Sequence, residues 1–254
     1  MDFLDAAILG VVEGVTEFLP ISSTGHLILA SSLLGLTQTD FVKSFEIAIQ
    51  LGAILSVVAL YWRKFLDVEV LKKLAVAFIP TGIIGLIFYK IAKQYLIGNE
   101  AVVVGALIIG GLALIAFEYF HSDSADEGSA QSISYKQSAL IGLFQSIAII
   151  PGVSRSAATI LGGLWLGLSR TTIVEFSFLL AVPTMLAATG LDLLKNASAF
   201  HADEFGILAI GFVVSFGVAL ASIKFLLAFI RRYDFTAFGV YRIIVALLFI
   251  FLAL

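Results

Sequence analysis

Two glutamates near the start of the chain, Glu13 and Glu17, have the spacing of a paired carboxylate site. Residues four apart on a helix lie on the same face, so both side chains point in one direction. Two neighbouring carboxylates repel each other unless a proton, an arginine or a cation lies between them. Hard divalent cations such as Mg²⁺ and Ca²⁺ prefer oxygen ligands. The pair therefore indicates a metal site, or a metal with a general base, unless this helix end reaches the headgroups and both carboxylates are solvated.

A polar run follows the glutamates, with the order Ser22, Ser23, Thr24, Gly25, His26. The free backbone N–H groups of a helix start bind anions, and serine and threonine hydroxyls add further donors. An imidazole that titrates near neutrality can act as acid or base, and it could activate Ser23 as a nucleophile. Helix capping is the alternative explanation, and it accounts for one hydroxyl better than for three.

A second polar run contains Ser154, Arg155 and Ser156, with Thr159 shortly after. The guanidinium of arginine is always charged, and its planar fork matches phosphate oxygens. At a predicted helix start between two serines, Arg155 indicates phosphate binding. The alternatives are an arginine that extends to the headgroups or pairs with one of the two glutamates. If the two runs meet, the groups suit phosphoryl transfer, in which positioning and charge neutralisation do most of the catalysis.

The composition predicts that these polar groups lie in a membrane protein. Hydrophobic residues make up 60% of the 254 residues and charged residues 13%, against the roughly 25% charged that is usual for soluble domains. A soluble domain of this size could not bury so much apolar surface. The net charge of −3 gives no basic field that would attract nucleic acid. The composition therefore excludes a soluble enzyme, a disordered chain and a nucleic-acid-binding protein.

Six segments are long and apolar enough to cross a bilayer, which takes about 20 residues. They are 42–62, 70–94, 100–120, 170–196, 206–232 and 238–254. Residues 2–34 and 135–167 are apolar but interrupted by proline and polar residues, and we interpret both as re-entrant helical hairpins. Lys224 and Arg242 lie inside spans and are expected to extend their charged ends to the interface.

The two hairpins also resemble each other in sequence. Each is followed by three spans, so the second half enters the membrane inverted, and sites in such inverted repeats form at mid-membrane between broken helices. The alignment sets residues 10–13 against 142–145, and Pro20 and Ser23 against Pro151 and Ser154, with one residue of slippage.

We therefore expect an all-α polytopic membrane protein of about ten helices, with six spans and two re-entrant hairpins. Residues 1–254 form a single integral membrane domain, in which 1–120 is the first repeat, 121–134 a polar linker and 135–254 the second, inverted repeat.

The distribution of lysine and arginine predicts the orientation, because cytoplasmic loops are enriched in both. This places both termini outside. The richer side holds Arg63, Lys64, Lys72, Lys73, Lys136, Arg170, Arg231 and Arg232, and the poorer side holds Lys43, Lys90, Lys93 and Lys195.

Residues 13–26, Glu-Gly-Val-Thr-Glu-Phe-Leu-Pro-Ile-Ser-Ser-Thr-Gly-His, and residues 151–156, Pro-Gly-Val-Ser-Arg-Ser, resemble the two signatures of the bacterial undecaprenyl-diphosphate phosphatase family of the bacitracin-resistance type. Residues 175–183 resemble the same family. The resemblance covers essentially the whole chain, in the same order and spacing.

The resemblance implies that the protein hydrolyses undecaprenyl diphosphate to the monophosphate, which recycles the lipid carrier for peptidoglycan synthesis and confers bacitracin resistance. It implies a bacterial plasma (inner) membrane protein that needs a divalent metal cation and opens its active site to the outer face. By motif match, Glu13 and Glu17 become metal or acid–base residues, His26 and Ser23 base and nucleophile, and Arg155 the diphosphate ligand. The other predicted substrate contacts are Ser22, Thr24, Ser154, Ser156 and Thr159.

Two questions stay open in the sequence. The architecture alone also suits a transporter or lipid flippase, although the reactive residues favour a phosphatase. In one mechanism Ser23 attacks the phosphorus and His26 takes its proton; in the other, which we slightly favour, water attacks with Glu17 or His26 as base and metal assistance. The expected partners are the polyprenyl diphosphate and the bilayer, and a homo-oligomer is compatible with the sequence.

Overall fold

The computed structural model describes residues 1–96, 99–120, 129–195 and 204–253, and every regular element within these ranges is a helix. The prediction of an all-α protein is therefore confirmed. The α-helices in these ranges are α1 (Phe3–Thr16), α2 (Ser23–Leu33), α3 (Asp40–Tyr61), α4 (Val68–Ile91), α5 (Glu100–Phe120), α6 (Tyr135–Ser146), α7 (Arg155–Trp165), α8 (Arg170–Lys195), α9 (Phe205–Ile230) and α10 (Thr236–Ala253).

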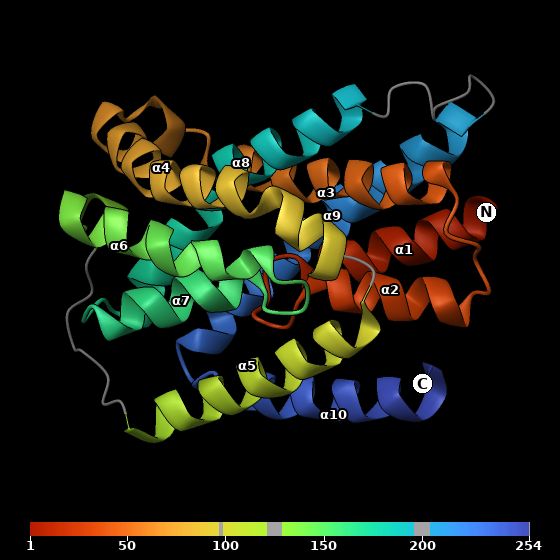
Figure 1. Ribbon diagram of the computed structural model, residues 1–254. Helices are drawn as coiled ribbons and strands as arrows, with labels where there is room; N and C mark the ends of the chain where they lie inside the picture. The colour runs from red at the N-terminus through yellow and green to blue at the C-terminus, as the bar shows by residue number, and fades with distance from the viewer. Residues whose placement is uncertain (97–98, 121–128, 196–203, 254) are drawn as a thin grey trace.

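Each predicted hairpin is a helix–turn–helix pair. Helices α1 and α2 are joined by a turn that we call the first tip, residues 17–22, and α6 and α7 by the second tip, residues 147–154. The hairpins point toward each other from opposite ends of the molecule, and the tips meet near its middle (Figure 1). The Ser156 hydroxyl donates a hydrogen bond to the Phe18 carbonyl at 2.8 Å, so the contact between the hairpins is direct.

Both tips end on a serine with an unusual backbone. Ser22 has φ 73° and Ser154 has φ 75°, and these are the non-glycine residues with positive φ in the described chain. Each side chain caps the following helix, because the Ser22 hydroxyl accepts from the Gly25 N–H and the Ser154 hydroxyl from the Ala157 N–H. The structural equivalent of Ser154 is therefore Ser22 rather than Ser23, and the slippage in the sequence alignment was wrong.

Glycines allow the hairpins to pack closely against long helices. On α1, a side chain at Gly10 or Gly14 would collide with backbone carbonyls of α9, and on α6 a side chain at Gly142 would collide with the Ala77 carbonyl of α4. Because glycine has no side chain at these positions, each hairpin packs directly against the backbone of a long helix.

Helices α5 and α10 run side by side (Figure 1) and approach each other through glycine as well. A Cβ atom at Gly111 would lie 2.7 Å from the Gly239 carbonyl oxygen, and one at Gly239 would lie 2.7 Å from the Gly111 carbonyl oxygen. Helix α3 packs against α8 and α9 on the other side of the tips. The tips are thereby enclosed among long helices.

The main hydrophobic core surrounds the two tips. Phe18 of the first tip is fully buried and meets the Phe178 ring of α8 edge to face, with the ring centroids 5.4 Å apart. The same core contains Ile141 of α6, Ile160 of α7 and Leu114 of α5. The site residues are therefore held in a closely packed region rather than in surface loops.

Five of the described helices, α3, α4, α5, α8 and α9, are long and apolar enough to cross a membrane. This confirms a multi-pass membrane protein. Helix α10 is apolar over Thr236–Leu252 but shorter, so the sixth span stays a prediction.

One end of the helix bundle is fixed by ion pairs. Lys64, just after α3, pairs with Glu175 of α8 at 3.1 Å between Nζ and Oε1. Arg170 at the start of α8 pairs with Glu118 near the end of α5, and Glu118 also accepts from the Phe235 N–H before α10. The ends of the chain marked N and C both lie at the opposite end of the molecule (Figure 1).

The predicted linker, 121–134, lies partly outside the described residues, which resume at 129. Its last residues form a short 3₁₀ turn, Ala130–Ser132, and Ala130 and Ile133 are fully buried in the main core. This part of the segment therefore packs onto the helices.

Candidate active site

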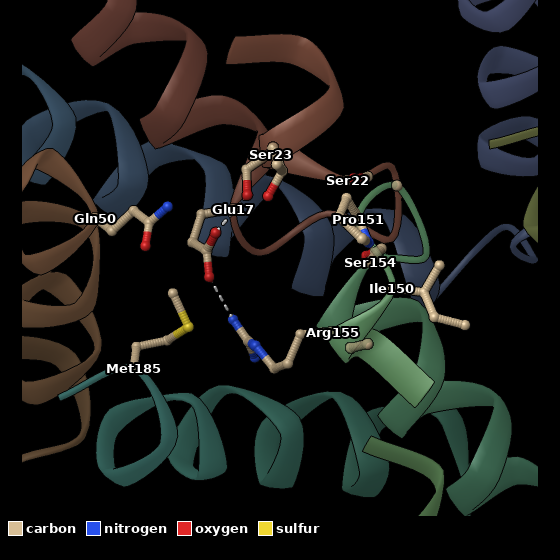
Figure 2. A pocket seen from close by; sticks show the side chains of 12 residues that line it. Glu17, Ser22, Ser23, Gln50, Ile150, Pro151, Ser154, Arg155 and Met185 are labelled. Carbon is tan, nitrogen blue, oxygen red and sulfur yellow. Dashed lines mark hydrogen bonds and ion pairs between the residues drawn. The ribbon is translucent and has the colours of Figure 1, made fainter. Parts of the chain in front are cut away.

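The two tips enclose a cavity of about 190 Å³. The first turns of α2 and α7 face it from opposite sides, and α3 and α8 complete its wall (Figure 2). Two helix N-termini that face one space direct free N–H groups and positive dipole ends into it, which favours an anion. The lining residues are Glu17, Ser22, Ser23, Thr24, Gln50, Ala148, Ile150, Pro151, Gly152, Ser154, Arg155 and Met185.

Glu17 connects the functional groups of the two tips. Its Oε1 atom accepts from Arg155 Nη2 at 2.8 Å, and its Oε2 atom accepts from the Ser23 hydroxyl at 2.6 Å (Figure 2). The exposed fractions of the Glu17 and Arg155 side chains are 5% and 10%, so this ion pair is largely shielded from solvent. Ser23 and Glu17 therefore lie at the distance expected between a hydroxyl nucleophile and its general base.

Arg155 is held in place by further contacts. Its Nη1 atom donates to the Ser177 carbonyl of α8 at 3.0 Å, and its guanidinium carbon lies 5.8 Å from the centre of the Phe18 ring. The fixed planar fork faces the cavity as a charged donor. The geometry therefore suits the recognition of a phosphate group.

The predicted substrate contacts fall into two groups. Ser22, Ser23, Thr24, Ser154 and Arg155 line the cavity, whereas Ser156 and Thr159 do not.

Ser156 and Thr159 lie outside the cavity and hold elements of its wall in place. The Ser156 hydroxyl bonds the first tip at the Phe18 carbonyl, and Thr159 Oγ1 lies 2.6 Å from Ser177 Oγ. Since the Ser177 carbonyl accepts from Arg155, Thr159 helps to fix the residue that holds the arginine.

Glu13 lies one turn before Glu17 and is fully buried. Neither of its carboxylate oxygens has a hydrogen-bond partner among the described residues. A buried carboxylate without partners is costly, and a proton or a cation relieves the cost. These oxygens fit a divalent cation as ligands, although the described residues contain no cluster of three or more carboxylate, histidine or cysteine side chains.

His26 lies beside the cavity but does not line it. Its Nδ1 atom is 2.8 Å from the Ser22 carbonyl oxygen and its Nε2 atom is 2.9 Å from the Tyr241 hydroxyl of α10. A carbonyl only accepts, so Nδ1 carries a proton and Nε2 is left to accept from the tyrosine in the neutral ring. Both ring nitrogens are therefore engaged, Nδ1 with the cap residue Ser22 and Nε2 with Tyr241, and an acid–base role for His26 stays a prediction.

An apolar groove of about 630 Å³ lies next to the cavity, between α5 and α7. Ile150 of the second tip lines both spaces, so the groove begins where the cavity ends. The groove is lined by Val102, Gly105, Ala106, Ile109, Gly110, Ala113, Phe117, Phe144, Ile147, Ile150, Val153, Ala157, Ala158, Leu161 and Trp165.

Residues 6–248 match the family model described as bacitracin resistance protein BacA. The chain belongs to this family. Among curated relatives, an undecaprenyl-diphosphatase of Sulfurihydrogenibium sp. (strain YO3AOP1) is 54% identical over 250 residues, which cover 98% of each chain. An undecaprenyl-diphosphatase of Aquifex aeolicus is 52% identical, with 96% of each chain covered, and one of Persephonella marina is 52% identical, with 100% of each covered.

Membership in the BacA family agrees with the two sequence motifs. The structure adds two contacts at the site that the motifs did not predict. The Ser177 carbonyl and the Met185 side chain, both on α8, belong to the surroundings of Arg155 and the cavity. Neither contact could be recognised in the sequence, because every residue has a backbone carbonyl and a methionine in an apolar helix has no distinctive chemistry.

The expectation for Arg242 was wrong. Its side chain does not extend to the interface but is fully buried against backbone carbonyls of both tips. An arginine within an apolar helix is a functional candidate by default, and this signal was present in the sequence.

Proposed function

We propose that this protein is a membrane phosphatase that hydrolyses undecaprenyl diphosphate to undecaprenyl phosphate and inorganic phosphate. The observation that carries the proposal is the position of Glu17, which bonds Ser23 of one hairpin and Arg155 of the other beside two helix N-termini. A nucleophile, its base and a phosphate ligand are thereby within reach of one bound headgroup. The names of the relatives support the same substrate.

The lipid substrate fits the two adjoining spaces. The diphosphate lies in the polar cavity, which is smaller than the roughly 300–1,000 Å³ of typical small-molecule pockets, and the first isoprene units follow the apolar groove past Ile150. Because the groove is lined almost wholly by apolar side chains, the rest of the tail continues into the bilayer. The hydrolysed lipid carrier becomes available again for peptidoglycan synthesis, and this recycling confers bacitracin resistance.

The 2.6 Å bond between Ser23 and Glu17 favours Ser23 as nucleophile and Glu17 as its base. Ser23 Oγ forms a bond to the terminal phosphorus while the bond from this phosphorus to the bridging oxygen breaks. Undecaprenyl phosphate leaves, and the serine proton goes to Glu17. Water then attacks the phosphorus of the phosphoserine while the bond from this phosphorus to Ser23 Oγ breaks. Glu17 returns its proton to Ser23 Oγ, the water loses one proton to the solvent, and inorganic phosphate leaves with the water oxygen.

Arg155 stabilises the charge on the transferred phosphoryl oxygens, and the N–H groups of the first turns of α2 and α7 add to this effect. For this to occur, the substrate must displace part of the ion pair between Arg155 and Glu17. The released carboxylate is then better able to accept a proton.

A divalent cation, Mg²⁺ or Ca²⁺, would be held by Glu13 with help from Glu17. When bound, it supplies charge neutralisation for the phosphoryl oxygens. The proposal is supported by the two unpartnered, buried oxygens of Glu13.

We also propose that the two halves form an inverted repeat with six spans. The packing supports it, because α1 lies on α9 as α6 lies on α4, and α5 pairs with α10. With the lysine- and arginine-rich end in the cytoplasm, both termini lie outside and the cavity serves the outer face.

Phosphate release by the purified, detergent-solubilised protein tests the proposed function. We expect release from undecaprenyl diphosphate, loss of release with EDTA, and recovery with added Mg²⁺ or Ca²⁺. Full activity in EDTA would remove the cation from the proposal, and no release under any of these conditions would overturn the phosphatase itself.

A Ser23→Ala variant tests the nucleophile separately. Acid-quenched wild-type enzyme should carry phosphate on Ser23, and the variant should carry none and turn over only slowly. Substantial turnover by Ser23→Ala would instead support direct attack by water.

A further inference from the structure

Arg242 of α10 lies behind the two tips and is fully buried. Its guanidinium makes five hydrogen bonds, and every acceptor is a backbone carbonyl. Within the described part of the chain, no carboxylate lies at ion-pair distance from it. A permanently charged group therefore uses its whole donor capacity to bind the backbone.

The acceptors come from both tips and from α5. Arg242 Nη1 donates to Pro20 of the first tip at 3.1 Å and to Val153 of the second tip at 2.9 Å. Arg242 Nη2 donates to Gly152 of the second tip and to Ala106 of α5, both at 2.9 Å. The guanidinium thus connects the backbones of the two hairpins through a single side chain.

These carbonyls lie directly before the two strained caps. Pro20 is two residues before Ser22, and Val153 is the residue before Ser154. Backbone with positive φ persists in a non-glycine residue only where its surroundings hold it there. Arg242 is part of those surroundings on both sides of the cavity.

Arginine suits this position because its planar fork has five N–H donors in fixed directions. Lysine has three donors on one atom, so it could reach only some of the same carbonyls. Gly110 of α5 leaves room for the guanidinium, because a Cβ atom there would collide with Arg242 Nη2 and Cζ.

We infer that Arg242 is a positioning residue for the phosphatase reaction, which fixes Ser23 and Glu17 of the first hairpin relative to Arg155 of the second. Arg242 is not among the residues that line the cavity, and it reaches them only through the backbone, at the carbonyl of Gly152. The inference rests on the proposed function, but its effect on the tips is measurable without turnover.

The first test compares Arg242→Lys and Arg242→Met with the wild type. We expect kcat per folded molecule to fall about 10²-fold for the methionine variant, the loss typical of a small misplacement of reacting groups, and by less for the lysine variant. Hydrogen exchange should rise at the amides of Gly25 and Ala157, which the two caps hold. A purely structural role would lower the unfolding temperature and the yield but leave kcat and KM of the folded protein unchanged.

The second test leaves Arg242 itself in place. Gly110→Ala should displace the guanidinium and lower kcat in the same direction. The matched control is Gly85→Ala in α4, where a Cβ atom would meet nothing within 4 Å, and it should retain wild-type kcat. If neither Arg242 variant folds, the comparison of Gly110→Ala with Gly85→Ala tests the positioning role of Arg242.

Wild-type kcat per folded molecule together with unchanged exchange at both caps, in any folded Arg242 variant or in Gly110→Ala, would overturn the inference. If the wild type releases no phosphate, the proposed function fails alone. The exchange at the two caps then still decides whether Arg242 fixes the tips.

Discussion

The two hairpins share a backbone and differ in their chemistry. Both turn through a serine with nearly equal φ, 73° at Ser22 and 75° at Ser154, and in both the serine hydroxyl caps the helix that follows. The next residue is Ser23 in the first hairpin and Arg155 in the second. The same turn therefore presents a hydroxyl on one side of the cavity and a fixed positive charge on the other.

A second pair of equivalent positions lies on the helices before the tips. Glu13 of α1 is buried with two unpartnered oxygens. Gln145 of α6 is also buried, but its Nε2 atom donates to Thr81 Oγ1 at 2.9 Å and to Thr184 Oγ1 at 3.1 Å. Glu13 therefore leaves two buried oxygens without a partner, whereas Gln145 leaves only Oε1 without one and uses its Nε2 atom to bond α4 and α8.

The fold thus provides two equivalent helix starts, at α2 and α7, and the side chains at these starts give them different chemistry. In the proposed mechanism, the first hairpin would transfer protons and hold the cation, and the second would bind the phosphate. Substitutions at matched positions can break or sharpen this comparison.

The largest effect is expected for Glu17→Gln. The amide cannot accept the serine proton and has no charge to pair with Arg155, so kcat should fall by about 10⁴-fold, the upper end for a general base. The measurement is phosphate release at saturating substrate. Glu69→Gln, at the exposed start of α4, is the control, and an equal loss there would show that the effect is not specific to the cavity.

Arg155→Ala tests the other hairpin. The loss of a fixed charge at the phosphoryl oxygens should lower kcat/KM on the order of 10³-fold. Arg155→Lys should recover only part of this loss, because lysine lacks the planar fork. An alanine variant close to the wild type would reject the role of the second hairpin in phosphate binding.

Glu13→Gln places a glutamine in the first hairpin, as Gln145 is at the equivalent position of the second hairpin. We expect kcat to fall about 10²-fold, since metal assistance is worth several kcal/mol, and the response to added Mg²⁺ to disappear. The rate is measured against Mg²⁺ concentration. An unchanged dependence on the cation would place the metal ligands elsewhere.

Gln145→Leu is expected to have the smallest effect. It removes two hydrogen bonds, and the net loss should be about 1 kcal/mol of stability, a fall of about 2–4 °C in the unfolding temperature. Because Gln145 lies outside the cavity lining, kcat should be retained. A large loss of kcat would mean that both equivalent positions take part in the chemistry.

Much of this site could be predicted from sequence. The low content of charged residues identified a membrane protein. Glu17 and Arg155, two of the few charged residues within apolar sequence, are in contact in the structure. The two interrupted apolar regions identified both hairpins, because each region divides into two pieces that are too short to cross the membrane.

The remaining features depend on three-dimensional packing. The role of the Ser177 carbonyl follows from where α8 lies, and the contacts of His26 follow from the approach of Tyr241 on α10. The burial of Arg242 was missed because a long charged side chain near a span is usually assumed to reach the interface. Only the meeting of the two tips with α5 and α10 determines which carbonyls it binds.

The most direct test of the account measures phosphate release from undecaprenyl diphosphate by the wild type, Glu17→Gln and Arg155→Ala, side by side at equal amounts of folded protein. The account predicts rapid release by the wild type and near-complete loss in both variants, although the two residues lie in different hairpins. Release by either variant at the wild-type rate would contradict a single site formed where the tips meet.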